Sequence, residues 1–450
     1  MHERQITELW QQLNQAGTVL TTEDNEPVTI IYPGRVNPNR GADFCDAVIA
    51  TSSGVVKGDI EVHVNSADWR AHGHHHNPDY DRVVLHVVWQ HTAVTGTWGI
   101  SIRHIPTVAL DKCFPKLSPQ YPRDSLEHTR HTCPMMCVNG DVSSGNIVHI
   151  LDSAGDERFA FKCQQFHHGM IPGEASQCLY QGLMAALGYS QNQLPFAELA
   201  RRLPLPVLES APRGLPDAEY LIRQQSLLLG TAGLLPSQRR VKLPDAETGS
   251  DYIDKIEKQW AASHPASTLP PIVWDLFRVR PGNFPVRRLL AMSHLLLRYR
   301  VAGLVTGIAQ LINGAPPQEG YHTLATGLTV IATGYWSRHL DFGMSSRQAS
   351  TSLLGTSRAA DMVVNVLLPF TFAWGQLNAD MALAEKCRTL YRQHPRLTAN
   401  SIEKHMMGQL RLNKRVVNSA RRQQGLLHIY KTLCTQGKCG ACRLATLKPA

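Results

Sequence analysis

The pattern of apolar and polar positions divides the chain into a strand-rich first part and a helical second part. Apolar residues recur at helical spacing over residues 6–13, which predicts one short helix. β-Branched and alternating runs follow, bounded by Gly, Pro, Asn and Asp, and they predict strands at residues 27–32, 44–50, 58–64, 82–89 and 97–105. From about residue 155 onward the period becomes helical.

This change of period predicts an α+β protein with several parts. We expect a mixed β-sheet domain at residues 1–110, a connecting segment at 111–154, an α-helical domain at 155–422, and a C-terminal helix with a Cys-rich metal-binding segment at 423–450. The apolar runs are shorter than the roughly 20 residues that a membrane helix needs. The first residues lack the apolar core of a signal peptide. A cytoplasmic protein without membrane contact is therefore expected.

Composition narrows the function classes. The chain has 450 residues, 43% hydrophobic and 18% charged, which is the balance of a folded globular protein. Its formal net charge of +9 favours an anionic partner, with nucleic acid first. Ten cysteines in a reducing compartment are expected to be metal ligands or buried thiols. No G-x₄-G-K-[ST] phosphate loop is present, so ATP would have to be bound by a partner.

Candidate chemistry begins at three residues of two predicted strands. Asp43 opens one strand, and Glu61 and His63 share a face of the next because side chains alternate along a strand. Two carboxylates beside a nitrogen base suit Mg²⁺ or Mn²⁺ with an adjacent base that orients or deprotonates a water. We therefore expect Asp43 and Glu61 to hold a metal ion and His63 to be the base or a third ligand.

The order of these elements resembles the restriction-endonuclease-like (PD-(D/E)XK) nuclease fold of type II restriction enzymes and Holliday-junction resolvases. In that fold a helix and a strand precede an Asp at the start of the second strand, and a Glu-x-base pair lies in the third. This chain has His63 where those enzymes have Lys, and neutral imidazole can do the same task near pH 7. The resemblance implies an extra acid on the first helix, for which Glu8 is the candidate.

Histidines in the same region offer a second kind of metal site. His72 and His74 can present two imidazoles to one transition metal, with His63 or His86 as the third ligand. His86 lies inside an apolar run, so a hydrogen-bonded core histidine is an equal alternative for it.

The same residues are similar to an uncharacterised bacterial family known only as a domain of unknown function. The resemblance covers nearly the whole chain, and its C-terminal part is the Cys-rich end. The motifs that carry it are Tyr32-Pro33-Gly34-Arg35, Asn37, Gly41, Asp43-Phe44, Gly58-Asp59, Glu61, His63, Trp69, His72-Gly73-His74, Asp79, Tyr80, Leu85-His86-Val87-Val88, Arg280-Pro281, Asn283-Phe284-Pro285 and Arg288.

A C-x₄-C-x₂-C pattern at the C-terminus predicts a second metal site. Three thiolates from Cys434, Cys439 and Cys442 need a fourth ligand. His428 would complete a tetrahedral Zn²⁺ site, and Cys387 would complete either Zn²⁺ or an iron–sulfur cluster. Three inert thiols are the alternative.

Four further polar residues are candidates for binding substrate. Arg280 and Arg288 flank a Pro- and Asn-containing corner and would grip phosphate, or else cap carbonyl groups between helices. Arg35 and Asn37 are close in sequence to Asp43 and have the better claim on a substrate anion.

The sequence thus favours a metal-dependent nuclease or related phosphodiester hydrolase acting on nucleic acid. One alternative is a zinc or iron enzyme centred on the histidines, on a β-rich, cupin-like domain that acts on a small molecule. The other alternative is a nucleic-acid-binding scaffold without catalytic activity.

Overall fold

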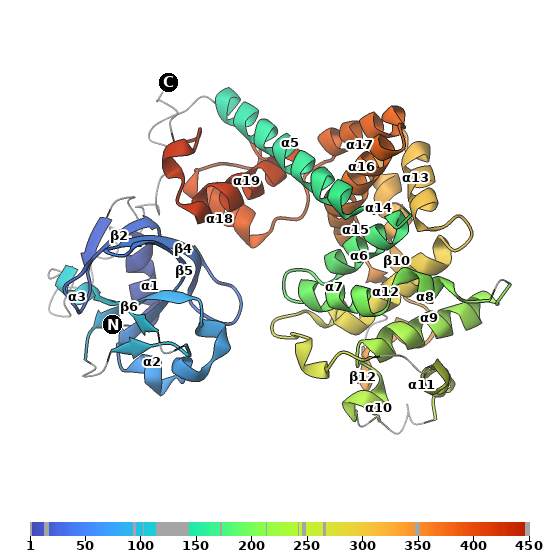
Figure 1. The fold of residues 1–450 in the computed structure, drawn as a ribbon, viewed down its shortest axis with the longest axis horizontal. Coiled ribbons are helices and arrows are strands. Elements are labelled where there is room, and N and C mark those ends of the chain that lie inside the picture. Colours follow the sequence, from blue (N-terminus) through green and yellow to red (C-terminus); the bar gives the residue numbers. More distant parts are fainter. Residues whose placement is uncertain are drawn as a thin grey trace. The chain divides into compact units, whose positions relative to one another are not determined.

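The computed structural model describes residues 2–12, 18–92, 96–101, 103–113, 144–171, 173–212, 214–241, 243–244, 249–263, 267–346 and 352–445. The chain forms two compact units, which are Met1–Arg158 with Ala399–Ala450, and Phe159–Thr398 (Figure 1). The boundary after Arg158 falls inside helix α5 (Ser144–Gly169). The expected mixture of an N-terminal sheet and a mostly helical remainder is confirmed.

The first unit is built on a seven-stranded mixed sheet with the order β1-β2-β4-β5-β6-β9, with β3 also paired to β4. The strands are antiparallel from β1 to β5, and β5, β6 and β9 are parallel. Their bounds are β1 Thr18–Thr21, β2 Pro27–Tyr32, β3 Arg35–Val36, β4 Phe44–Thr51, β5 Gly54–Asn65, β6 Val83–Gln90 and β9 Thr107–Ala109.

Four of the predicted strands are therefore confirmed as β2, β4, β5 and β6. The fifth, predicted at residues 97–105, is wrong as a single strand. It is a short antiparallel pair, β7 (Thr97–Trp98) and β8 (His104–Ile105), because the chain reverses where Gly99 N–H donates to the Arg103 carbonyl. The last strand of the main sheet is β9 instead.

The two faces of the sheet have different coverings. Helix α1 (Glu3–Gln12) buries Ile6, Leu9 and Trp10 against one face, where Ile60 and Val62 of β5 also lie. The apolar spacing of α1 matches one side of a 3.6-residue helix, so this helix is the predicted one. Because side chains alternate, the neighbours of Ile60 and Val62 in β5 point to the other face.

That other face is covered by the connection between β5 and β6. Parallel neighbours cannot be joined by a tight turn, so the chain crosses over through α2 (Asp68–Ala71), η1 (His74–His76) and η2 (Pro78–Tyr80). Trp69 is 1% exposed and anchors this crossover, since it packs with Ala42 and Ile105 and its indole N–H donates to the Trp98 carbonyl at 3.0 Å.

The C-terminal residues complete the first unit. We call residues 399–445 the C-terminal module; it contains α18 (Ser401–Gln409), α19 (Ala420–Thr432), η8 (Cys434–Gln436) and η9 (Cys439–Ala441). Its apolar residues form one cluster with Tyr32 and Val48 of the sheet and with Ile147 and Leu151 of α5. Residues about 400 positions apart in sequence therefore share one core.

The second unit is helical. Its helices are the end of α5, α6 (Ala175–Leu187), α7 (Gln193–Arg202), α8 (Leu205–Glu209), α9 (Asp217–Thr231), α10 (Pro236–Arg239), α11 (Asp251–Ser263), α12 (Pro285–Arg298), α13 (Leu304–Gly314), α14 (Gly320–Leu328), α15 (Thr356–Met362), α16 (Leu368–Leu377) and α17 (Met381–Gln393). Two small antiparallel pairs, β10 (Val330–Ile331) with β13 (Ser352–Leu354) and β11 (His339–Asp341) with β12 (Met344–Ser345), lie among them. Within the described residues, every helix is too short or too polar to cross a membrane.

Candidate metal centre on the sheet

Three imidazoles converge over the face of β5 that carries Glu61 and His63. His63 comes from the strand itself, whereas His72 and His74 come from the crossover between β5 and β6. His63 Nε2 lies 3.2 Å from His72 Nδ1 and 3.2 Å from His74 Nε2. The ligand atoms of all three residues lie within 4.8 Å of one another.

A carboxylate oxygen joins this group. Glu61 Oε1 is 3.5 Å from His63 Nε2 and 3.3 Å from His74 Nε2. Zn–N bonds of 2.0–2.1 Å in a tetrahedron place neighbouring ligand atoms about 3.3 Å apart. The observed separations match that edge length, so the donor set fits a metal ion bound by three histidines and one glutamate.

Hydrogen bonding alone gives a poorer account of this cluster. His63 Nδ1 is 2.9 Å from His86 Nε2, so a neutral His63 that donates there presents a lone pair at Nε2. That single lone pair faces two other imidazole nitrogens and lies near a carboxylate. Several acceptors aimed at one point are the arrangement that a cation satisfies.

The two carboxylates are locked together beside the imidazoles. Asp43 N–H donates to Glu61 Oε2 at 3.0 Å, and Val62 N–H donates to Asp43 Oδ2 at 3.0 Å. Burial, with the charge of Glu61, raises the pKa of Asp43 to about 7. Burial also raises the pKa of Glu61 to about 8. A bound cation would offset this cost, because opposite charge stabilises the ionised carboxylates.

The imidazoles are poised as neutral ligands. Burial, and then the neighbouring His74 and His72, lower the pKa of His63 to about 3. Burial likewise lowers the pKa of His74 and of His86. Neutral imidazole is the form that coordinates a metal.

A buried chain of hydrogen bonds stands behind His63. His86 Nδ1 is 3.0 Å from Thr97 Oγ1, which is 3.0 Å from Thr107 Oγ1. His86, Thr97 and Thr107 are at most 4% exposed. Such partners fix the tautomer and orientation of a ligating imidazole. The structure therefore selects His63 as the third histidine ligand and places His86 behind it.

A bulge in β4 shapes the edge of the site. The register shifts by one residue between Phe44↔Ile60 and Ala47↔Gly58, and Asp46 has a φ of 64°. Bulges of this kind redirect side chains next to functional sites. Tyr80 of η2 stacks on His74 with ring centroids 3.8 Å apart and so closes the other side.

Helix α1 contributes a different acid from the expected one. Glu8 makes an exposed ion pair with Arg4, with Oε1 3.2 Å from Nε. The acid of this helix that acts on the site is Glu3, whose negative charge adds to burial in raising the pKa of Asp43 and Glu61. Glu3 and Glu8 are five positions apart, so they point in different directions around the helix. The amphipathic pattern of α1 alone did not indicate which acid faces the site.

The candidate substrate-binding residues have structural contacts. Arg35 Nε donates to the Tyr430 hydroxyl at 3.4 Å, and Asn37 Nδ2 donates to the Arg40 and Ala42 carbonyls at 2.9 and 2.8 Å. Arg35 thus joins β3 to the C-terminal module, and Asn37 orders the loop before Asp43.

The other two candidates belong to the second unit. Arg288 is 4% exposed and donates to the Leu353 carbonyl, the Tyr189 hydroxyl and Asn283 Oδ1, so it stabilises the interior of that unit. Arg280 is exposed.

The C-terminal cysteines lie in tight turns. Cys434 and Cys442 are buried in the cluster shared with the sheet, and Cys439 is half-buried. Among residues 2–445, as far as they are described, these thiols belong to no group of three ligands within 4.8 Å. Cys387 lies in α17, in the other unit.

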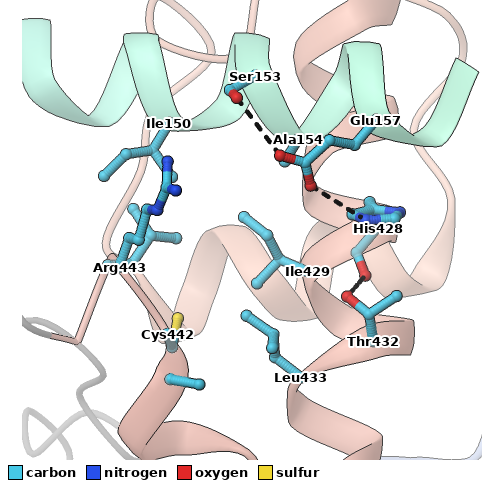
Figure 2. Close-up of a pocket in the computed structure, with 12 residues that line it drawn as sticks. Ile150, Ser153, Ala154, Glu157, His428, Ile429, Thr432, Leu433, Cys442 and Arg443 are labelled. Atoms are coloured by element: carbon cyan, nitrogen blue, oxygen red, sulfur yellow. Dashed lines mark hydrogen bonds and ion pairs between the residues drawn. The ribbon is translucent and has the colours of Figure 1, made fainter. Parts of the chain in front are cut away.

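The fourth ligand expected for these cysteines has another partner. A cavity of about 210 Å³ lies between α5, α19 and the C-terminal turns (Figure 2). Figure 2 shows His428 turned toward Glu157 of α5, with Nε2 3.4 Å from Oε2. Cys442 and Arg443 also line this cavity.

One further group of potential ligands lies elsewhere on the sheet. Glu23, Asp24 and His104 have ligand atoms within 4.8 Å of one another. His104 faces the two acids with different nitrogens, Nε2 at 3.6 Å from Glu23 and Nδ1 at 3.9 Å from Asp24. One imidazole nitrogen binds one ion, so this group fits a metal less well than the histidine cluster does.

The sheet and its histidine–carboxylate cluster define an α/β protein with a candidate transition-metal centre. Residues 3–399 match the family described as "Protein of unknown function (DUF2851)", and the chain belongs to this family. No curated protein and no solved structure matches the chain.

Proposed function

We propose that this protein is a metal-dependent hydrolase that cleaves phosphodiester bonds in nucleic acid. The observation that carries the proposal is the convergence of His63, His72 and His74 with Glu61 at the spacing of metal ligands, beside Asp43. A metal ion bound there would polarise a phosphodiester and lower the pKa of a water.

The topology around the cluster supports the nuclease class. Strands β2, β4 and β5 are antiparallel neighbours and β6 is parallel to β5, with α1 before them and α2 in the crossover. Asp43 immediately precedes β4, and Glu61 and His63 lie in β5. This is the order on which the restriction-endonuclease-like resemblance rests.

The donor set bears on which metal is used. Imidazole nitrogen suits Zn²⁺ and Fe²⁺, whereas Mg²⁺ prefers oxygen ligands. We therefore propose a transition-metal ion at the histidine cluster. Asp43 and Glu61 form the pair that would favour Mg²⁺ or Mn²⁺, so those ions belong in the same assay.

The residues of the chain have separable roles in this proposal. Glu61 and the three histidines hold the metal, and the chain from His86 to Thr107 keeps His63 oriented. Asp43 is held beside Glu61 and supplies a carboxylate that accepts a hydrogen bond from the attacking water.

The histidine ligands also suit the alternative of a zinc or iron enzyme acting on a small molecule. The parallel pairing of β5, β6 and β9 differs from the antiparallel double sheets of cupins, so we retain the ligands of that alternative and not its barrel.

The test is hydrolysis of single- and double-stranded DNA and RNA by the wild type with Zn²⁺, Fe²⁺, Mn²⁺ or Mg²⁺. Asp43→Asn and the double variant His72→Ala/His74→Ala are expected to lose activity by a factor of at least about 100. His76→Ala is the matched control, since His76 is exposed in the same crossover. Cleavage that survives in both site variants would refute the proposal.

A further inference from the structure

The positive charge of the chain is concentrated at its C-terminus. The chain has 45 Lys and Arg against 36 Asp and Glu, a formal net charge of +9. Residues 399–450 contain ten Lys and Arg and one acid, Glu403, which also makes +9. The remaining residues therefore have a formal net charge of zero.

Two of these basic residues hold the C-terminal module in place. Arg421 Nε donates to Asp156 Oδ1 at 2.8 Å, and Arg422 Nε donates to Asp152 Oδ1 at 3.0 Å, so both are neutralised by α5. They are structural and leave little charge for a partner.

Four other basic side chains face solvent without a carboxylate partner among the described residues. They are Lys404, Arg411, Lys414 and Arg415, which we call the basic surface. The single acid of the module is removed from it, because Glu403 is 0% exposed and accepts a hydrogen bond from Gln423 Nε2 at 2.7 Å. The exposed charge of the described part of the module therefore has one sign.

The tip of the basic surface is ordered by the chain itself. Asn413 Oδ1 accepts hydrogen bonds from the N–H groups of Arg415 and Val416 at 2.9 and 3.2 Å, and Val417 is fully buried. A side-chain turn of this kind fixes the backbone locally. The basic side chains thus project from a defined turn between α18 and α19.

The module docks on the strands next to the candidate site. Arg35 Nη1 lies 3.5 Å from Ser401 Oγ at the start of α18, and the Tyr430 hydroxyl donates to Asp46 Oδ2 at 2.8 Å. Arg35 is paired with Cys45, two residues after Asp43. The basic surface and the metal centre therefore belong to one unit and meet through β3 and β4.

We propose that the basic surface binds the phosphate backbone of nucleic acid and holds the substrate of the metal centre. The identity of this partner rests on the proposed function. Unpaired, exposed Lys and Arg side chains bind phosphate by releasing its counterions, independently of base sequence. Four such contacts correspond to a slope of about −3.6 when log K for duplex DNA is plotted against log salt.

An anionic membrane is the other surface that basic side chains bind. Stable binding there also needs large apolar side chains that enter the bilayer interface. In the described part of the module none is exposed, since Met406 and Leu410 are buried and Met407 and Leu412 pack on the shared core. This composition favours nucleic acid.

The experiment compares binding of a fluorescent 30-base-pair DNA duplex, and of its single strands, by the full chain in EDTA from 50 to 300 mM salt. The double variant Lys414→Glu/Arg415→Glu is expected to bind at least about tenfold more weakly at 100 mM salt, with a slope smaller by about 2. Arg240→Glu/Lys258→Glu makes the same change of charge at exposed positions of the other unit and should bind as the wild type does.

Failure of this inference is distinguishable from failure of the proposed function. Wild-type affinity of the Lys414/Arg415 variant, absence of DNA binding by the wild type, or a preference for phosphatidylserine vesicles over DNA would each overturn it. The variant His72→Ala/His74→Ala should still bind DNA, so binding without cleavage by the wild type refutes only the proposed function. Hydrolysis of bis(p-nitrophenyl) phosphate, if the wild type shows it, should be unchanged in Lys414→Glu/Arg415→Glu.

Discussion

Individual side chains determine whether this surface can hold a metal. His63 is the shared member of the cluster, because its Nε2 faces His72 and His74 while its Nδ1 faces His86. A ligand at the centre of such a network depends on the groups that orient it. Residues without any contact to a metal should therefore affect metal affinity.

The buried chain behind His63 gives the first prediction. His86→Gln and Thr97→Val should each weaken metal binding by about 10- to 100-fold, because His63 loses its fixed tautomer and orientation. Competition with a chelator of known affinity measures this, and His76→Ala is the control. Unchanged affinity in both variants would show that the chain only fills the core.

The acids of α1 give the second prediction. Removing the charge of Glu3 with Glu3→Gln should weaken binding of a divalent cation by up to about fivefold, because attraction across a solvated distance amounts to about 1 kcal/mol or less. Glu8→Gln should leave the affinity unchanged, since Glu8 pairs with Arg4 away from the site. Isothermal titration with Mn²⁺ measures both, and equal effects of the two variants would contradict the assignment.

Strand alternation and spacing were sufficient to predict which residues gather at the site. They placed Glu61 and His63 on one face and proposed His72 and His74 as ligands, and the structure brings these four together with Asp43. They left open whether His63 or His86 is the third ligand, because that choice depends on how far the crossover reaches over the sheet. The direction of each acid on α1 depends on the docking angle of that helix, which local pattern does not contain.

At the scale of secondary-structure elements, two glycines fix how α5 and α19 cross. A Cβ at Gly155 would collide with the Arg421 carbonyl, and one at Gly425 would collide with the Leu151 carbonyl. The reciprocal contacts let the two backbones touch. The ion pairs of Arg421 and Arg422 with α5 depend on this close approach.

The helix crossing gives the third prediction. Gly425→Ala should destabilise the first unit by about 1–3 kcal/mol, since overpacking forces the two backbones apart. Gly408→Ala in α18 is the matched control, because nothing lies within 4 Å of its Cβ position. That control should be neutral or stabilising by up to about 1 kcal/mol. Urea unfolding of both variants measures the difference, and equal stabilities would contradict the packing argument.

The contact between β2 and α18 gives the fourth prediction. The Tyr32 hydroxyl lies 2.6 Å from His405 Nε2, and burial lowers the pKa of His405 to about 4. The unfolded chain binds a proton at this residue below its ordinary pKa of about 6.5, whereas the folded chain binds it only near pH 4. Stability should therefore be constant above about pH 7 and fall as the pH drops from 6.5 toward 4.

The variant that tests this pH dependence is His405→Gln, which keeps a polar partner for Tyr32 but does not titrate. In EDTA, the loss of unfolding free energy between pH 7 and pH 5 should be smaller in this variant by about 1–2 kcal/mol. Parallel curves for wild type and variant would show that His405 does not contribute.

At the scale of the whole molecule, the chain begins and ends in the same unit. Pattern and spacing predicted a strand-rich beginning and helices after it, but the docking of residues 399–450 on the sheet is a contact between distant segments. Local periodicity reports which face of an element is apolar and not which partner covers it. The charge of the chain follows the same division, since residues 399–450 carry all of its net charge.

The central claim is that the histidine cluster holds a transition-metal ion. The most direct measurement is the metal content of the full-length protein, purified without chelators and analysed by inductively coupled plasma mass spectrometry. We predict about one equivalent of zinc or iron in the wild type and in His76→Ala, and loss of that metal in His72→Ala/His74→Ala. A wild type that holds no metal as purified, and takes up none from Zn²⁺ or Fe²⁺, would contradict the account.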